Sequence, residues 1–265
     1  MASAKDIMVK PITAQAAAKL VRAVHYSGKT VTNSQLHFGV FLDGKLEGAM
    51  QFGPSLDKRK TQCLVDGTGW NNFLELNRMA FSDQLPRNSE SRALGVAMRL
   101  IKKHYPHIEW VISFSDGTQC GDGTIYRASG FVLTDIKVSK NLAMLPSGVA
   151  VHKMTLESSP SVARQELNGQ SYYDVTGGKY NFARYVEVSK AKIIPGFQLR
   201  YVYFLNPDAR QRLTVPILPF SKIDEMGAGM YKGQARVKQA TTEVHSEGRR
   251  GGTDPHAPSP ESQIS

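Results

Sequence analysis

The sequence is short of cysteine and of long apolar stretches, and both shortages narrow the class of protein. Two cysteines, Cys63 and Cys120, are too few for a disulfide framework and form no CxxC zinc motif, so a reducing cytoplasm fits best. No stretch approaches the roughly 18 apolar residues that a membrane-spanning helix needs. Residues 1–6 contain no apolar signal core. We therefore expect a cytoplasmic protein with no membrane partner.

Signature motifs of several enzyme classes are also missing. The chain has no Gly-x-Ser-x-Gly nucleophile elbow, no Walker phosphate loop and no His-Glu-x-x-His zinc motif. Acidic residues are outnumbered, with 33 Lys and Arg against 23 Asp and Glu and a net charge of +10 at pH 7. This excess favours a polyanionic partner, nucleic acid before an anionic membrane surface, although a basic protein without a special partner has the same composition.

With 265 residues, of which 41% are hydrophobic, the chain is long enough for a large domain with a full core. Apolar periodicity and turn signals predict helices over 12–25, 89–105 and 124–129, and strands over 37–42, 45–52, 73–81, 111–115, 131–133, 149–154 and 200–205. The first two strands should form a hairpin, because Asp43-Gly44 suits a turn whose two central residues have positive φ. This order predicts an α/β fold with a mixed central sheet flanked by helices.

Composition changes along the chain and predicts four parts. Residues 1–156 should form the core. Residues 157–192 are rich in Ser, Gly and Tyr with weak periodicity, which indicates an insertion or a flap. Residues 193–239 should form a basic extension that packs on the core, since the stretch 191–240 holds eight Lys and Arg against three acids. The Gly-, Pro- and Ser-rich residues 240–265 should be disordered.

The connection between the strand at 73–81 and the helix at 89–105 is a candidate binding site. In such sheets ligands bind at the carboxyl ends of strands, and a helix start offers free N–H groups and a positive dipole end to an anion. Asn88 or Ser89 should cap this helix. The residues expected to hold a phosphate or pyrophosphate are Arg87, Asn88, Ser89, Ser91 and Arg92. Ordinary capping without a ligand explains the same residues equally well.

Four further residues, which lie at or near the ends of predicted helices or strands, are candidates for catalysis. Asp116 follows a strand and can meet a substrate there, although a plain Asx turn explains it too. His25 and Tyr26 end the first helix, and Tyr126 lies on the short helix before Gly130; packing explains these three as readily as catalysis.

The element order and the pattern Tyr126-x-x-x-Gly130-Phe131 resemble the GNAT acyltransferase superfamily, in which acyl-CoA lies between two splayed strands with its pyrophosphate on a helix start. More narrowly, residues 20–155 and 195–232 resemble the phage Mom-type proteins. The segments that carry this resemblance are His25-Tyr26-Ser27-Gly28, Glu75-Leu76-Asn77-Arg78, Asn88-Ser89-Glu90-Ser91-Arg92, Ser113-Phe114-Ser115-Asp116, Tyr126-Arg127-Ala128-Ser129-Gly130-Phe131, Arg200-Tyr201-Val202-Tyr203-Phe204-Leu205 and Pro216-Ile217-Leu218-Pro219.

The resemblance implies conversion of adenine in duplex DNA to N6-carbamoylmethyladenine, which blocks host restriction enzymes, in the cytoplasm of a bacterial host. The active-site residues that it implies are His25, Tyr26, Arg78, Asp116 and Tyr126, with Tyr126 as the acid for a departing CoA thiolate. It also implies acetyl-CoA or another acyl donor and leaves open a metal ion, with iron as the candidate. The loop 87–93 departs from the GNAT pattern because it has no glycine, which leaves the donor open.

Duplex DNA would need cations along its phosphates. The residues expected to supply them are Lys58, Arg59 and Lys60, in a polar loop over 53–69, together with Arg200 and Lys222. Two alternatives stay open. A generic GNAT acyltransferase on a protein or small amine explains Tyr126 and the fold, and a non-enzymatic DNA-binding anti-restriction protein explains the charge.

Overall fold

The computed structural model describes residues 2–25, 28–117, 122–231 and 234–235. Its strands are β1 (Met8–Pro11), β2 (Leu36–Leu42), β3 (Lys45–Gly53), β4 (Phe73–Phe81), β5 (Trp110–Asp116), β6 (Val132–Met144), β7 (Ala150–His152), β8 (Lys192–Phe204), β9 (Met230–Tyr231) and β10 (Gln234–Ala235). Its helices are α1 (Ala14–Val24), α2 (Lys58–Gln62), α3 (Ser89–His104), α4 (Thr124–Ala128), α5 (Lys153–Glu157), α6 (Tyr172–Thr176), α7 (Phe182–Val188), α8 (Pro207–Gln211) and α9 (Ser221–Glu225), with 3₁₀ turns η1 (Ala4–Asp6) and η2 (Gln165–Leu167).

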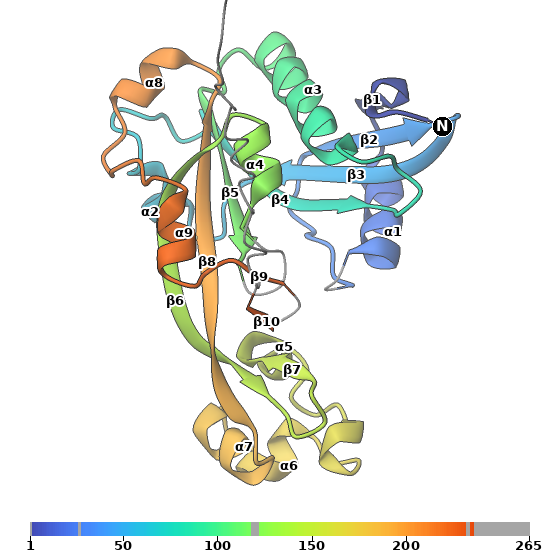
Figure 1. The fold of residues 1–265 in the computed structure, drawn as a ribbon, viewed down its shortest axis with the longest axis vertical. Coiled ribbons are helices and arrows are strands. Elements are labelled where there is room, and N and C mark those ends of the chain that lie inside the picture. Colours follow the sequence, from blue (N-terminus) through green and yellow to red (C-terminus); the bar gives the residue numbers. More distant parts are fainter. Residues whose placement is uncertain (1, 26–27, 118–121, 232–233, 236–265) are drawn as a thin grey trace, which may run out of the picture.

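An eight-stranded mixed sheet in the order β1-β2-β3-β4-β5-β8-β6-β7 runs through the molecule (Figure 1). Only β4 and β5 pair in parallel among its described strands. The prediction of an α/β fold with a mixed central sheet is confirmed. No helix in the described ranges is long and apolar enough to cross a bilayer.

Local sequence signals set several element boundaries. Asp43 and Gly44, with φ of 49° and 77°, connect β2 to β3 as a tight hairpin requires. Thr13 caps α1 by accepting a hydrogen bond from the Ala16 N–H over 3.2 Å. Gly130 follows α4 with a φ of 86°, in the left-handed conformation that closes a helix. Turn and cap chemistry alone thus predicts where these elements begin and end.

Helix α3 buries the apolar stripe that its periodicity predicts. Leu94, Ala97, Met98 and Ile101 are almost completely inaccessible to solvent and belong to the main hydrophobic core. The basic side chains of α3 lie on its exposed face. This packing fixes the start of the helix against the sheet.

A β-bulge at Asn77 separates β4 from its parallel neighbour. β4 and β5 pair over four residues only, ending at the pair Leu76–Ser113. The register of β4 with β3 shifts between Gln51 and Phe52, where Asn77 is the extra residue. A bulge bends the strand that carries it, so β4 leaves β5 beyond this point, while the rest of β5 stays paired with β8. The sheet therefore opens between its two parallel strands.

Strand β8 lies inside the sheet, between β5 and β6. The sequence predicts that residues 193–239 pack on the core as an extension, and the structure differs, because β8 pairs antiparallel with both neighbours along most of its length. Tyr201 and Val202 are fully buried there. The order of elements along the chain does not reveal this arrangement, because β8 follows residues 153–190 in the sequence yet lies between β5 and β6 in the sheet.

The segment predicted as an insertion or flap folds into short helices at the far end of β6 and β8 (Figure 1). We call residues 153–190 the helical lobe. The lobe and the adjoining strands enclose a hydrophobic cluster of their own, made of Ala143, Leu145, Val151, Leu156, Leu167, Tyr172, Val175 and Tyr185. Its helices are five to seven residues long, too short for an apolar period to show clearly in the sequence.

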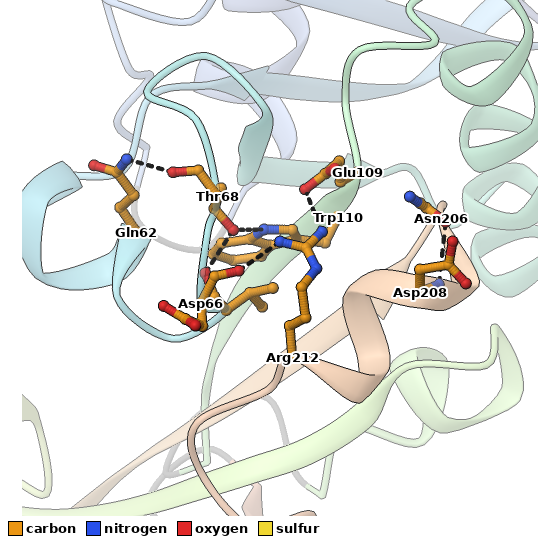
Figure 2. A network of polar contacts seen from close by, with 9 residues as sticks. Gln62, Asp66, Thr68, Glu109, Trp110, Asn206, Asp208 and Arg212 are labelled. Atoms are coloured by element: carbon orange, nitrogen blue, oxygen red, sulfur yellow. Dashed lines mark hydrogen bonds and ion pairs between the residues drawn. The ribbon is translucent and has the colours of Figure 1, made fainter.

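At the start of β5, a polar network ties three distant segments together (Figure 2). The indole N–H of Trp110 donates to the Thr68 hydroxyl over 3.1 Å, and Arg212 pairs with Glu109 over 2.8 Å. The same arginine also donates to the Asp66 carbonyl. Arg212, one of the basic residues of the 191–240 stretch, is therefore committed to the fold.

Candidate active site

A cavity of about 510 Å³ lies where β4 and β5 separate. Its lining includes His25, Arg78, Glu90, Asp116, Asp122 and Tyr126. Four of the five residues expected at the active site thus meet in one cavity, although they are up to 101 positions apart in the sequence. The fifth, Tyr26, lies outside the described residues.

Arg78 directly follows the bulge at Asn77, which turns its side chain toward the cavity. Its Nη1 donates to the Asn77 carbonyl over 2.6 Å and its Nε to the Lys29 carbonyl over 3.1 Å. Two backbone acceptors thus hold the guanidinium in one orientation. A fixed positive charge in a partly buried site can stabilise negative charge that develops on a reacting oxygen.

His25 is the residue that ends α1, and its N–H donates to the Val21 carbonyl over 2.9 Å. Burial, with a smaller contribution from the Arg78 charge, lowers the pKa of His25 from 6.5 to about 4. The ring is therefore neutral at pH 7. A neutral imidazole can accept a hydrogen bond or a proton in the cavity.

Tyr126 is held on both its hydroxyl and its ring. The Ser113 hydroxyl donates to the Tyr126 hydroxyl over 2.9 Å, and the Tyr126 ring stacks on Tyr201 with centroids 4.8 Å apart. The Tyr201 hydroxyl donates to the Asp122 carbonyl over 2.8 Å. Burial, followed by the neighbouring Asp122 and Tyr126, raises the pKa of Tyr201. Gly123 has a φ of 67° and packs directly against Tyr201, so a side chain there would displace the stack.

Asp116 is the last residue of β5, at the carboxyl end where ligands of such sheets bind. The chain is packed closely just after it: the Gly117 N–H donates to the Phe197 carbonyl over 2.9 Å, and a Cβ at Gly117 would lie 2.6 Å from the Ala228 carbonyl oxygen. The segment around Ala228 therefore fixes the backbone beside Asp116. The carboxylate is partly accessible and lines the cavity.

The start of α3 differs from the prediction. No side chain caps it, because Asn88 adopts the left-handed conformation with a φ of 70° and Ser89 is buried. Asn88 thus holds a left-handed backbone conformation that is most readily adopted by glycine. The Ser89 hydroxyl is buried and has no hydrogen-bond partner among the described residues. Arg87 and Arg92 are exposed beside it, and Ser91 bonds the Asn88 carbonyl.

These features fit a ligand with anionic groups. An uncapped start of a 16-residue helix leaves backbone N–H groups and the positive dipole end to an outside partner. Glu90, on the first turn of α3, lines the same cavity as Asp116, so the helix start adjoins the cavity. The residues expected to hold the donor lie outside its lining: Arg87, Asn88, Ser89, Ser91 and Arg92.

The described residues fit a metal ion poorly. No group of three or more His, Cys, Asp or Glu side chains able to hold one occurs in them. His25 and Asp116 are ligand types in the same cavity, but two ligands do not complete a usual site. We therefore derive no chemistry through a metal.

The residues expected to bind DNA do not gather on one face. Arg200 bonds Thr134 over 2.9 Å and pairs with Asp135, and burial lowers its pKa, so its guanidinium is committed to the fold. Lys222 pairs with Glu225 over 2.9 Å. The position of β8 inside the sheet thus leaves most of the Arg200 side chain within the fold, and its contact with phosphate stays a prediction.

The other three cations lie on α2, a short helix where the sequence predicts a loop, because Asp57 caps it. Arg59 and Lys60 are exposed. Lys58 lies over the Trp70 ring at 4.5 Å, and burial lowers its pKa.

Three residues of the site were not singled out by the sequence: Glu90, Asp122 and Tyr201. Glu90 is an ordinary acidic residue of a first helical turn. The Asp122 carboxylate accepts hydrogen bonds from the N–H and the hydroxyl of Thr124 over 3.2 and 2.6 Å, as an aspartate before a helix often does. Tyr201 lies in a strand motif with several aromatic residues. Only the order of strands brings Tyr201 under Tyr126.

A model of the Mom protein family matches residues 6–222. The chain belongs to this family. The resemblance inferred from the sequence motifs is thereby confirmed. The methylcarbamoylase Mom of Escherichia phage Mu is 33% identical over 220 residues, which cover 80% of this chain and 81% of that Mom protein.

Several solved acetyltransferases are similar to this Mom-family chain in backbone arrangement. An IAA acetyltransferase from Bacillus cereus has 9% identity and a TM-score of 0.40, covering 73% of this chain and 97% of that chain. A GNAT family acetyltransferase from Elizabethkingia anophelis, solved with acetyl-CoA bound, has 14% identity and a TM-score of 0.37, covering 56% and 93%. The ribosomal-protein-S18-alanine N-acetyltransferase from Escherichia coli has 10% identity and a TM-score of 0.40, covering 76% and 94%.

Proposed function

We propose that the protein modifies adenine in duplex DNA at N6, giving N6-carbamoylmethyladenine, and so protects the DNA from restriction in the cytoplasm of a bacterial host. The observation that carries this proposal is the meeting of His25, Arg78, Asp116 and Tyr126 in one cavity of a Mom-family chain. The cavity volume of about 510 Å³ suits a small ligand or an extruded base.

Adenine N6 is a weak nucleophile, because its lone pair is delocalised into the ring, and inside a duplex it is out of reach. The enzyme must therefore take the base out of the stack. Asp116 then accepts a hydrogen bond from the exocyclic amine and receives one of its protons as the new bond forms at N6. The neutral ring of His25 helps to orient the base.

Tyr126 and Arg78 act on the other reactant. Tyr126 gives its proton to the leaving group of the donor, and Ser113 holds the phenol in place for this transfer. Arg78, fixed by two backbone carbonyls, stabilises negative charge on the donor's carbonyl oxygen. These proton and charge roles apply to whichever donor delivers the group.

An acyl donor such as acetyl-CoA would bind at the start of α3. The residues that would hold its phosphates are Arg87, Asn88, Ser89, Ser91 and Arg92. The uncapped helix start and the unpaired Ser89 hydroxyl support this placement. For the carbamoylmethyl product, the donor would have to present a methylene carbon that bears the carboxamide, so that N6 bonds to this carbon as its bond to the leaving group breaks. Attack of N6 on the acyl carbon of acetyl-CoA would instead give an acetylated adenine.

The test is mass spectrometry of nucleosides from the DNA of bacteria that express the full chain. We expect an adenosine species heavier by a carbamoylmethyl group, and its loss in Asp116→Asn. The matched control is Asp43→Asn, which changes an exposed carboxylate in the hairpin turn at a position where asparagine tolerates the positive φ.

Each other result contradicts part of the proposal. An acetylated adenine would keep DNA as the substrate and replace the product by that of simple acyl transfer. Unmodified DNA from a folded and abundant protein would favour a protein or small-molecule amine as acceptor. Full modification by folded Asp116→Asn would remove Asp116 from the role at N6.

A further inference from the structure

The helical lobe lies beyond the mouth of the cavity, at the end of a two-stranded ribbon. The pairing of β5 with β8 ends at Asp116–Gln198. β6 and β8 continue to pair with each other past this point as far as Met144–Lys192. The ribbon therefore carries the lobe away from the end of β5 at which the cavity opens (Figure 1).

The lobe also contacts the core beside the cavity. The Lys29 ammonium donates to the Ser158 hydroxyl at the end of α5 over 2.9 Å, and the Lys29 carbonyl accepts from Arg78. At the other end of α5, His152 lies close enough to Asp116 for that carboxylate to counteract the lowering of the His152 pKa by burial. One end of α5 thus contacts Lys29, whose carbonyl helps to hold Arg78, and the other end lies near Asp116.

Several positively charged side chains of the ribbon and lobe have no acidic partner in the described part of the chain. Residues 137–192 contain eight Lys and Arg and four Asp and Glu. Glu157 pairs with Lys153, Glu187 pairs with Arg184, and Asp174 accepts the Ser171 N–H in a capping box. Within residues 137–192, the exposed lysines that form no ion pair with the described part of the chain are Lys137, Lys140, Lys179, Lys190 and Lys192.

The basic C-terminal stretch behaves differently. Arg200, Arg212 and Lys222 all have acidic partners within the fold. The ribbon and lobe therefore present exposed lysines that form no ion pair with the described residues, on a segment of which the sequence marks only residues 157–192 as an insertion or flap.

We propose that the ribbon and the helical lobe bind the phosphates of the duplex whose adenine enters the cavity. The proposal rests on the proposed function for its partner, duplex DNA, and adds the surface that holds it. A duplex lying across the cavity mouth would meet α5 and the ribbon lysines while its target base reaches Asp116. Contacts to phosphates position a duplex without reading its sequence.

Binding of a labelled 24-base-pair duplex to the full chain, followed by fluorescence anisotropy at several salt concentrations, tests this surface without any donor. The lobe variant replaces Lys137, Lys140, Lys179 and Lys190 by Gln. The control variant makes the same four changes at Lys19, Lys45, Lys102 and Lys103, which are exposed on α1, the β2–β3 hairpin and α3. Thermal unfolding verifies that both variants fold.

We expect the lobe variant to bind the duplex at least tenfold more weakly than the parent chain at moderate salt. Its slope of log affinity against log salt should be shallower by about 2 to 4, since each lost phosphate contact removes about 0.9. The control variant should stay close to the parent. Parent-like binding by the lobe variant, a larger loss in the control, or preference for single-stranded RNA over the duplex would each overturn the proposal.

The binding experiment and the nucleoside analysis can give different answers, so the DNA-binding surface and the proposed chemistry are tested separately. Duplex binding that depends on the lobe lysines would support this surface even where nucleoside analysis finds no modified adenine. Modified adenine together with parent-like binding by the lobe variant would support the chemistry and reject the surface.

Discussion

The hydroxyl of Ser113 donates a hydrogen bond to the hydroxyl of Tyr126 over 2.9 Å, joining the middle of β5 to α4. Because the phenol oxygen accepts this bond, its own proton points elsewhere. The stack on Tyr201 prevents the ring from turning away. A phenol held in this way, at the wall of the cavity, is oriented to give its proton to a leaving group.

Tyr126→Phe should lower the rate of DNA modification by about 100-fold, because it removes the acid and keeps the ring stack. The free energy of unfolding should fall by only about 1 kcal/mol, the contribution of one hydrogen bond. Time-resolved nucleoside analysis and urea unfolding measure the two effects. In Ser113→Ala the phenol keeps its proton and loses its partner, so its rate should lie between those of the parent and Tyr126→Phe. A Tyr126→Phe variant with the parent's rate would exclude Tyr126 as the acid.

Asn88 allows a test of the loop that starts α3. Its side chain makes no capping bond and its φ is 70°, so Asn88→Gly should leave stability and donor binding close to those of the parent. Asn88→Ala should cost about 1 kcal/mol, since a left-handed backbone is unfavourable for alanine. Thermal unfolding and calorimetric titration with CoA measure these changes. Equal stability of the two variants would show that the loop does not depend on this conformation.

His25 should make stability depend on pH. Its pKa is 6.5 in the unfolded chain and about 4 in the folded one, so between these values only the unfolded state binds the proton. Stability should therefore fall as the pH drops from 6.5 to 4, by about 2 kcal/mol after allowance for the partly exposed ring.

Urea unfolding across that pH range, on the parent and on His25→Asn, measures the contribution of His25. His37 and His152, whose pKa values burial also lowers, remain in both proteins, so the difference between the two curves isolates His25. If the free energy of unfolding depended on pH in the same way in both proteins, the His25 ring would be exposed to solvent and its pKa would be unchanged by folding.

The network at the start of β5 should matter for stability and not for chemistry. The Thr68 hydroxyl accepts from the Trp110 indole over 3.1 Å and donates to the Val65 carbonyl over 2.6 Å. Thr68→Val keeps the shape and leaves the buried indole N–H of Trp110 unpaired, while the Val65 carbonyl still accepts the backbone N–H of residue 68. The change should therefore cost about 1 to 3 kcal/mol in urea unfolding. Thr214→Val, the same change at an exposed hydroxyl, should cost less than about 0.5 kcal/mol. A comparable loss in both variants would contradict the argument from burial.

Several parts of this protein follow from local sequence. The Asp43-Gly44 turn, the Thr13 cap, the apolar stripe of α3 and the glycine after α4 each depend on neighbours a few residues away. The motifs around Arg78, Asp116 and Tyr126 predicted residues that do share a cavity. These predictions succeed because backbone preference and side-chain periodicity act within a single element.

Other features depend on contacts between distant segments. The place of β8 between β5 and β6, the bulge at Asn77 that opens the sheet, and the separate core of the helical lobe have no local signature. The same is true of the contacts of Arg200 with Thr134 and Asp135.

The sequence by itself determined the helices α1, α3 and α4, the β2–β3 hairpin, the family and most of the side chains of the candidate site, because turns, caps and short motifs are local. Only the tertiary structure decided which of the many cations stay uncommitted, since an ion pair such as Arg212–Glu109 joins residues 103 positions apart. It also decided that Tyr126 rests on Tyr201 and that the lobe reaches Lys29. These relations depend on strand order, which local preferences do not specify.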